Sequence, residues 1–295
     1  MDVERIDRIG MAVAELEPQV DLLEGLFGFT TKQRLRDDVA GVERVLMSVP
    51  GTPDIEWEVS APTRAASYLQ GFIDSPLGPG LHYVRIRVPS LSAAVEDLRA
   101  AGIEPRSEQA GTQEQPVEEV LIHGHGFQFR VRGPGGLEHR PNPPPAREGS
   151  VGITAIDHLA HAHGDCDELA AWYTRAFGMT SLDRFTTSEF VQVVMETPAG
   201  QLRWEAMHPA DDASFVARFL ERRGSAMHHI AFEVADWDAA VGACVAHGVQ
   251  PFRESTGVTD DGARWMDGFI HPRQTGGVLV QFFWEERPGI WGRTG

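Results

Sequence analysis

The chain repeats itself, and this repeat constrains its fold more than any other feature of the sequence. Three segments of the first half align with three segments of the second half in the same order. The pairs are 5–29 with 155–179, 57–62 (WEVSAP) with 204–209 (WEAMHP), and 81–105 with 227–251. Residues 132–150 between them are rich in Pro and Gly, as linkers often are. We therefore predict two homologous domains, 1–140 and 151–295, joined by a linker at 141–150.

A finer repeat lies inside each half, which contains twice a short apolar strand, an amphipathic helix and further strands. The helix expected near Leu91 has apolar residues at helical spacing, and Gly102 follows where a left-handed cap is expected. Residues 237–248 repeat this pattern. Further strands are expected at 189–198, 200–207 and 277–284. A strand–helix–strands unit that occurs four times predicts an α+β fold.

Charge and composition exclude several classes of protein. The formal net charge of −17 argues against a nucleic-acid partner and against general attraction to anionic membranes. No apolar run approaches the roughly 20 residues of a membrane span, and the N-terminus lacks a signal peptide's apolar region. Cys166 and Cys244 have no metal-site spacing and leave one possible disulfide. We expect a cytoplasmic protein that acts on a small molecule.

The segment SAMHHIAFEV (225–234) places two histidines at the head of a predicted strand. Because side chains on a strand alternate between its faces, His229 and Ala231 share one face and His228 lies on the other. The same alternation places His161 and His163 opposite His158 in HLAHAHGD (158–165). Second-shell or structural roles are therefore expected for His161 and His163.

The motifs IDHLAHA, HHIAFEVADWDAAV (228–241) and HPRQTGGVLVQFF (271–283) resemble the vicinal oxygen chelate superfamily. This superfamily includes glyoxalase I, methylmalonyl-CoA epimerase, the type I extradiol dioxygenases and bleomycin-resistance proteins. The resemblance covers nearly the whole chain. It implies four βαβββ modules that form two tandem glyoxalase-like domains with cupped mixed β-sheets. It also implies a divalent metal ion held by one residue from each of four strands.

The resemblance assigns four metal-ligand positions in the second half: His158, Glu205, His229 and Gln281. Gln281 stands where the family usually has Glu. Imidazole, carboxylate and amide donors on adjacent strands suit Fe²⁺, Mn²⁺, Co²⁺, Ni²⁺ or Zn²⁺. The expected substrate cavity involves two small residues that leave room for a ligand and two polar residues of nearby loops. These four residues are Ala160, Ala231, Arg264 and His271.

In the first half the corresponding positions hold Arg8, Glu58, Tyr83 and Gln128, which we interpret as a degenerate metal site. The guanidinium of Arg8 cannot bind a metal, and it could pair with Glu58 instead. Two further cations, Arg85 and Arg87, share the face of Tyr83. A purely structural domain is the favoured interpretation, and an anion or effector site is the alternative.

The resemblance implies a metal-dependent isomerase or lyase of the glyoxalase and epimerase type. The metal would stabilise an enolate-like intermediate as a Lewis acid, and Glu205 would act as the base because Gln281 cannot. A ring-cleaving extradiol dioxygenase with Fe²⁺ in the C-terminal domain is one alternative, although Gln281 replaces the expected glutamate there. A non-catalytic ligand-binding or resistance protein is another. Family likeness also suggests a homodimer.

Overall fold

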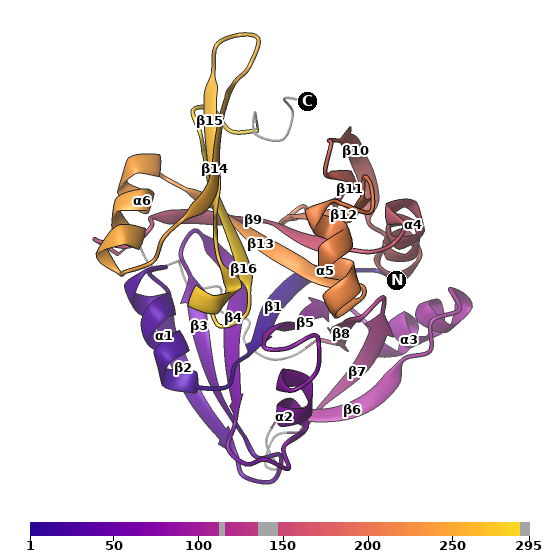
Figure 1. Cartoon of the computed structure of the whole chain (residues 1–295). Helices are drawn as coiled ribbons and strands as arrows, with labels where there is room; N and C mark the ends of the chain where they lie inside the picture. The colour runs from indigo at the N-terminus through magenta and orange to yellow at the C-terminus, as the bar shows by residue number, and fades with distance from the viewer. Residues whose placement is uncertain (112–115, 135–146, 290–295) are drawn as a thin grey trace. The chain divides into compact units, whose positions relative to one another are not determined.

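The computed structural model describes residues 1–111, 116–134 and 147–289 (Figure 1). The elements of the first half are β1 (Arg5–Ala12), α1 (Leu16–Gly25), β2 (Thr30–Asp37), β3 (Val42–Val49), β4 (Thr52–Pro62), α2 (Tyr68–Ile73), β5 (Gly80–Arg87), α3 (Leu91–Ala100), β6 (Arg106–Gly111), β7 (Pro116–Gly124) and β8 (Phe127–Arg132). Those of the second half are β9 (Ile153–Ala162), α4 (Cys166–Phe177), β10 (Thr180–Thr186), β11 (Phe190–Glu196), β12 (Arg203–Pro209), α5 (Phe215–Arg223), β13 (Ala226–Val234), α6 (Trp237–Ala246), β14 (Phe252–Val258), β15 (Arg264–Ile270), the 3₁₀ helix η1 (Pro272–Gln274) and β16 (Leu279–Glu285).

Each half of the sequence forms one eight-stranded mixed sheet, and the two sheets have the same strand order. The first sheet runs β2-β3-β4-β1-β5-β8-β7-β6 and the second β10-β11-β12-β9-β13-β16-β15-β14. β5 and β8 pair in parallel, as do β13 and β16, whereas β2–β3–β4 and β10–β11–β12 pair antiparallel. The four βαβββ modules and the α+β class predicted from the repeat are therefore confirmed.

The helix predicted near Leu91 is α3, whose Ala94 and Leu98 are buried. Gly102 has φ +76°, the left-handed conformation expected just beyond the helix, where a residue without Cβ is not strained. The predicted strand at 200–207 begins later, at Arg203, because Gly200 belongs to a turn with φ +62°. Two short helices, α2 and α5, were not predicted. Each follows the last strand of a module.

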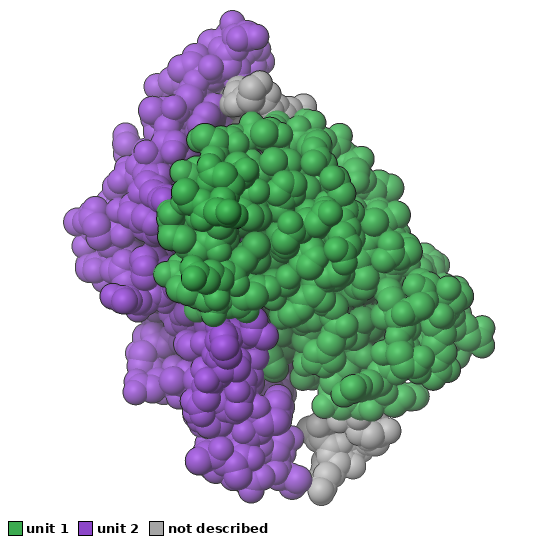
Figure 2. Space-filling model, turned by 45° about the vertical axis from the view of Figure 1, so that its right-hand side comes forward, with its two compact units in different colours: residues 1–10, 82–140, 160–227 green, residues 11–81, 141–159, 228–295 purple. Residues whose placement is uncertain are grey.

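The described chain divides into two compact units, and each takes one module from each half of the sequence (Figure 2). Unit 1 comprises residues 1–10, 82–140 and 160–227, and unit 2 comprises 11–81, 141–159 and 228–295. The division into domains 1–140 and 151–295 stays a prediction about sequence homology. Residues 141–146 of the predicted linker lie outside the described residues.

The core of unit 1 is an aromatic cluster around Phe129 of β8. Its ring lies 4.8 Å from Phe177 and 5.7 Å from Trp172 of α4, and 5.9 Å from Trp204 of β12, measured between ring centroids. Phe129, Phe177 and Trp204 are fully buried. Burial of such large apolar surfaces is the main force that holds the two modules of the unit together.

Unit 2 has an aromatic core of the same kind. Phe232 of β13 lies 6.1 Å from both Phe27 and Phe29, and Phe29 lies 5.7 Å from Trp57 of β4. Phe232 comes from the last module of the chain and the other three residues from the first. Its position on the opposite face of β13 from His229 agrees with the predicted alternation.

Candidate metal centre

The four predicted ligand positions lie on four neighbouring strands, in the order β12-β9-β13-β16. His158 is on β9, His229 on β13 and Gln281 on β16, all within unit 2. Glu205 is on β12, in unit 1. All four side chains are buried. Ala231 stands opposite Gln281 in the parallel ladder, so Gln281 and His229 project from the same face of the sheet.

The two histidines meet through their Nε2 atoms, which lie 3.1 Å apart. Two imidazole nitrogens that bind one ion at about 2.1 Å stand roughly 3.0 to 3.4 Å from each other. The separation of the His158 and His229 nitrogens therefore fits two cis ligands of a single transition-metal ion. Their rings meet edge to face, with an interplanar angle of 80°.

The other nitrogen of each ring is already engaged. Nδ1 of His158 lies 2.7 Å from Oδ2 of Asp157, and Nδ1 of His229 lies 2.8 Å from Nδ1 of His228. A carboxylate that accepts the Nδ1 proton leaves Nε2 of His158 with its lone pair free, as in many metal sites. Strand alternation alone predicted that His228 points away. The structure corrects this, because the two rings reach each other at the start of β13.

Burial keeps His229 in the form that can bind a metal. It lowers the pKa of this imidazole well below 6.5, and the neighbouring His228 and His158 act in the same direction. A hydrogen bond with Gln281 opposes the shift.

Asp267 of β15 is a buried residue of this site that sequence reasoning missed. Its Oδ2 accepts a hydrogen bond of 2.9 Å from Nε2 of Gln281. Burial raises the pKa of this carboxyl group, although its hydrogen bonds with Gln281 and Ser255 oppose the change. Asp267 thereby fixes which end of the amide faces the histidines. A polar residue in the strand RWMDGFI was the available signal.

Glu205 occupies the β12 position with a polar neighbour from the adjacent strand. Its Oε1 accepts a hydrogen bond of 3.3 Å from Nε2 of Gln192, on β11. The carboxylate is thus held on the buried face of β12 rather than in solvent.

Comparison with known protein families identifies the family of this chain. The model of the Glyoxalase/Bleomycin resistance protein/Dioxygenase superfamily matches residues 7–117 and 157–266. The chain belongs to this superfamily. The resemblance read from the sequence is therefore confirmed, and the match includes one segment in each half of the chain.

Two curated relatives of this superfamily are enzymes. Mitochondrial methylmalonyl-CoA epimerase of Homo sapiens is 30% identical over 135 residues, which is 45% of this chain and 76% of the epimerase. A 4-hydroxyphenylpyruvate dioxygenase of Pseudomonas aeruginosa is 33% identical over 104 residues, 32% of this chain and 29% of the dioxygenase.

The superfamily fold extends over the whole tandem arrangement. A solved structure of a 4-hydroxymandelate synthase mutant from Streptomyces coelicolor matches with a TM-score of 0.75, at 14% identity, over 97% of this chain and 94% of that chain.

Within the described residues, no helix has the length and apolar character to cross a bilayer. Cys166 and Cys244 are both free and buried, so the one disulfide that the sequence allowed is not formed.

The residues expected around the substrate differ in their surroundings. Ala160 packs in a buried cluster with Ala162, Met207 and Val216 of α5. Ala231 is buried and pairs with Gln281, and its place in a substrate cavity stays a prediction. Arg264, the first residue of β15, and His271 are exposed: Arg264 forms an ion pair of 3.6 Å with Glu286, and His271 caps η1.

Among the four first-half positions interpreted as a degenerate metal site, the fourth needs correction. In the second half, Ala231 pairs with Gln281, whereas in the first half the equivalent pair is Arg85 with Arg130. Arg130 therefore takes the place of Gln281, and the predicted Gln128 lies opposite Tyr83. Sequence alignment across β8 could not fix this shift, because both strands are short.

The first-half face is rich in cations, as expected. Arg85 forms a two-bonded ion pair with Asp7, at 2.6 and 3.1 Å. Glu119 lies 3.7 to 3.8 Å from three arginines, Arg85, Arg130 and Arg132. These two buried acids, which sequence reasoning did not single out, neutralise part of the charge. Arg8 and Glu58 belong to different units, so their ion pair stays a prediction.

Proposed function

We propose that the protein is a divalent-metal-dependent enzyme of the epimerase and glyoxalase type, acting on a small oxygenated substrate. The observation that carries this proposal is the buried pair His158 and His229, whose Nε2 atoms lie 3.1 Å apart while both Nδ1 atoms are engaged. The sequence similarity to methylmalonyl-CoA epimerase supports the same class of reaction.

In this proposal the two histidines and the amide oxygen of Gln281 supply three ligands, and Glu205 supplies the fourth. His158, Glu205 and His229 have the donor chemistry for a divalent metal. Two imidazoles with two oxygen donors suit Fe²⁺, Mn²⁺, Co²⁺, Ni²⁺ or Zn²⁺ and leave positions for substrate oxygens. When bound, such an ion supplies Lewis-acid stabilisation of negative charge on a substrate oxygen.

Glu205 is the residue that we assign to proton transfer. The reaction needs a base next to the carbon whose proton is removed, and the amide of Gln281 cannot accept that proton. The hydrogen bond from Gln192 to Oε1 of Glu205 restrains the position of the carboxylate. A single base that takes and returns one proton favours an isomerase or a lyase.

An Fe²⁺-dependent dioxygenase is the second candidate, favoured by the 33% identity with 4-hydroxyphenylpyruvate dioxygenase over 104 residues. An amide at Gln281 in place of a carboxylate donates less charge to Fe²⁺, which ranks this candidate lower.

Deuterium exchange tests the proposal. The whole protein, loaded with Co²⁺ or Mn²⁺, is incubated in D₂O with methylmalonyl-CoA and with 2-oxo acids, and deuterium beside the carbonyl is measured by NMR. We expect incorporation by the wild type and its loss in Glu205→Gln. Glu196→Gln, which changes an exposed carboxylate on β11, is the matched control and should exchange normally.

The same preparation, loaded with Fe²⁺, is assayed with an oxygen electrode against 4-hydroxyphenylpyruvate and catechols. Oxygen uptake without deuterium exchange would replace the proposal by the dioxygenase. Ligand binding with neither reaction would indicate a non-catalytic binding protein.

A further inference from the structure

A two-residue hairpin turn between β7 and β8 presents a histidine in an unusual conformation. His125 has φ +50° and the following Gly126 has φ +79°. Positive φ at both central positions is the geometry that joins two twisted antiparallel strands most directly. Glycine adopts positive φ without steric strain, whereas a histidine adopts it less often.

The surroundings of the turn hold it firmly within unit 1. A Cβ atom on Gly126 would lie 1.7 Å from the carbonyl oxygen of Ser225, and one on Gly124 would lie 2.1 Å from the ring of Trp172. The carbonyl oxygen of His125 accepts a hydrogen bond of 2.9 Å from Nε2 of His161. The backbone that carries His125 is therefore positioned before any ligand binds.

His161 can donate a hydrogen bond to this turn because its ring carries the hydrogen on Nε2. A carbonyl oxygen only accepts, so Nε2 of His161 carries the hydrogen and Nδ1 accepts from the hydroxyl of Tyr173, at 2.6 Å. The structural role expected for His161 is what the structure shows.

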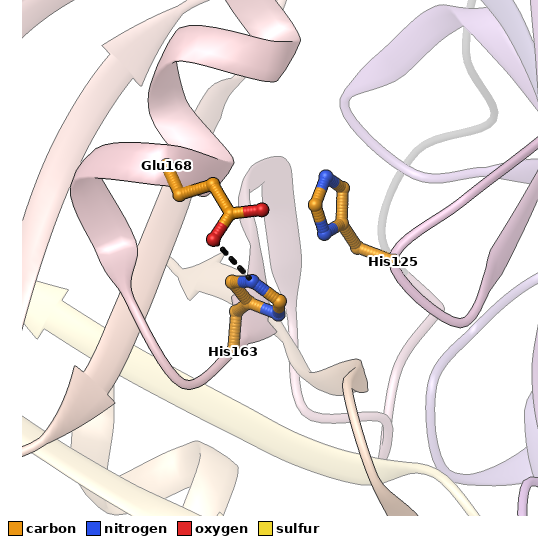
Figure 3. Close-up of side chains that lie close together, drawn as sticks. All are labelled: His125, His163 and Glu168. Atoms are coloured by element: carbon orange, nitrogen blue, oxygen red, sulfur yellow. Dashed lines mark ion pairs between the residues drawn. The ribbon is translucent and has the colours of Figure 1, made fainter.

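His163 lies next to His125, with ring centroids 4.5 Å apart. Its Nδ1 forms a hydrogen bond with the hydroxyl of Ser225, which directs Nε2 towards α4. Nε2 lies 3.6 Å from Oε2 of Glu168 (Figure 3). Glu168 stands in the first turn of α4, where its backbone N–H is capped by Asp165 at 3.1 Å.

We propose that His125, His163 and Glu168 form a second binding site for a divalent transition-metal ion of the Zn²⁺ class. One ligand atom from each residue lies within 4.8 Å of the others, and the three side chains point towards one another (Figure 3). The 3.6 Å between His163 and Glu168 is close to the roughly 3.4 Å that separates two ligands of a tetrahedral Zn²⁺.

Metal binding would require a small movement of one side chain, Glu168. The carboxylate of Glu168 is 62% exposed, so it can swing towards the histidines without repacking the core. Its two partners are less exposed, and their backbones are fixed by the turn and by β9. Three protein ligands would leave the fourth position to water.

This site is separate from His158 and His229 and uses a different part of the fold. Its ligands come from the β7–β8 turn, from the loop between β9 and α4, and from the first turn of α4, not from strand interiors. An ion there would join the second module of the chain to the third, within unit 1. The proposal does not depend on the catalytic proposal above.

The test is Zn²⁺ binding by the untagged whole chain, measured by equilibrium dialysis and plasma mass spectrometry. To remove the first site, all variants are built on His229→Ala. We expect about one equivalent in His229→Ala alone and a loss of binding when His163→Ala is added. His123→Ala is the matched control, because His123 is an exposed histidine two residues before His125 on β7, and it should leave binding unchanged.

Glu168→Gln is a second test that should not disturb the fold, because the side chain is exposed and the amide has the same size as the carboxylate. We expect its affinity for Zn²⁺ to fall by more than about tenfold. Unchanged stoichiometry and affinity in both His163→Ala and Glu168→Gln would overturn the proposal.

Discussion

Acid should destabilise the protein through His161, a fully buried histidine of unit 1. Its two ring nitrogens bond the hydroxyl of Tyr173 and the carbonyl oxygen of His125, and its full burial favours the neutral ring. Burial is the main cause that lowers the pKa of His161 from 6.5 to about 3, and the nearby His125 and His163 contribute to the shift.

The sign and size of the effect follow from proton linkage. Below pH 6.5 the unfolded chain binds a proton at His161, whereas the folded protein does not until the pH nears 3. Stability that is present above pH 6.5 is therefore lost as the pH falls, by about 1.4 kcal/mol per pH unit. Between pH 7.5 and pH 5.0 the loss from this one residue is about 2 kcal/mol.

The assay is urea unfolding at these two pH values, in the presence of a chelator, for the wild type and His161→Gln. A glutamine amide can donate to the carbonyl of His125 and accept from Tyr173, but it does not titrate. The free energy of unfolding of the wild type should fall by about 2 kcal/mol more than that of the variant. The other histidines contribute equally to both proteins. Equal losses in the two proteins would refute the reasoning.

Four further substitutions test the aromatic core of unit 1, the β7–β8 turn and the candidate metal centre. His229→Ala should remove about one equivalent of metal from the reconstituted wild type, measured by plasma mass spectrometry. Phe129→Ala should lower the free energy of unfolding by about 3 to 5 kcal/mol in urea titrations, because it empties the aromatic core of unit 1. Gly126→Ala should lower it by more than about 1 kcal/mol, since φ is +79° there. Asp267→Ala should weaken Co²⁺ binding about 10- to 100-fold in calorimetry, because the amide of Gln281 loses the partner that orients it.

Much of the fold could be predicted because the sequence carries the same signal four times. The strand–helix–strands unit and the glycine after α3 are local patterns, and local patterns survive without knowledge of the packing. Helix α5 was not predicted, although its apolar residues Phe215, Val216, Phe219 and Leu220 stand at helical spacing and pack in one cluster. The pairing of modules into compact units could not be predicted, because it depends on contacts such as Phe129 with Trp172, which no periodicity reveals.

The candidate metal centre was predicted in part for the same reason. His158, His229 and Gln281 stand in motifs that can be recognised one strand at a time. Asp267 and His228 could not be assigned in this way. The first requires the register of β15 against β16, and the second requires the orientation of two adjacent rings.

The comparison of the two halves suggests why only the second has kept a candidate metal centre. Where the second half has His158 and Gln281, the first has Arg8 and Arg130, so guanidinium groups stand in place of two ligands. The guanidinium of Arg130 lies 4.4 Å from the centre of the Tyr83 ring, a cation–π contact.

The tyrosine that stands in place of the second histidine also changes the packing of the first half. A Cβ atom on Gly10 would lie 2.2 Å from the Tyr83 ring, so this bulky side chain depends on a glycine at the position that is Ala160 in the second half. Changing Tyr83 to histidine would therefore leave a gap above Gly10 and two arginines repelling the ion. A metal site in the first half would need substitutions at several positions together, which explains physically how one repeat can lose its chemistry while both keep the same sheet.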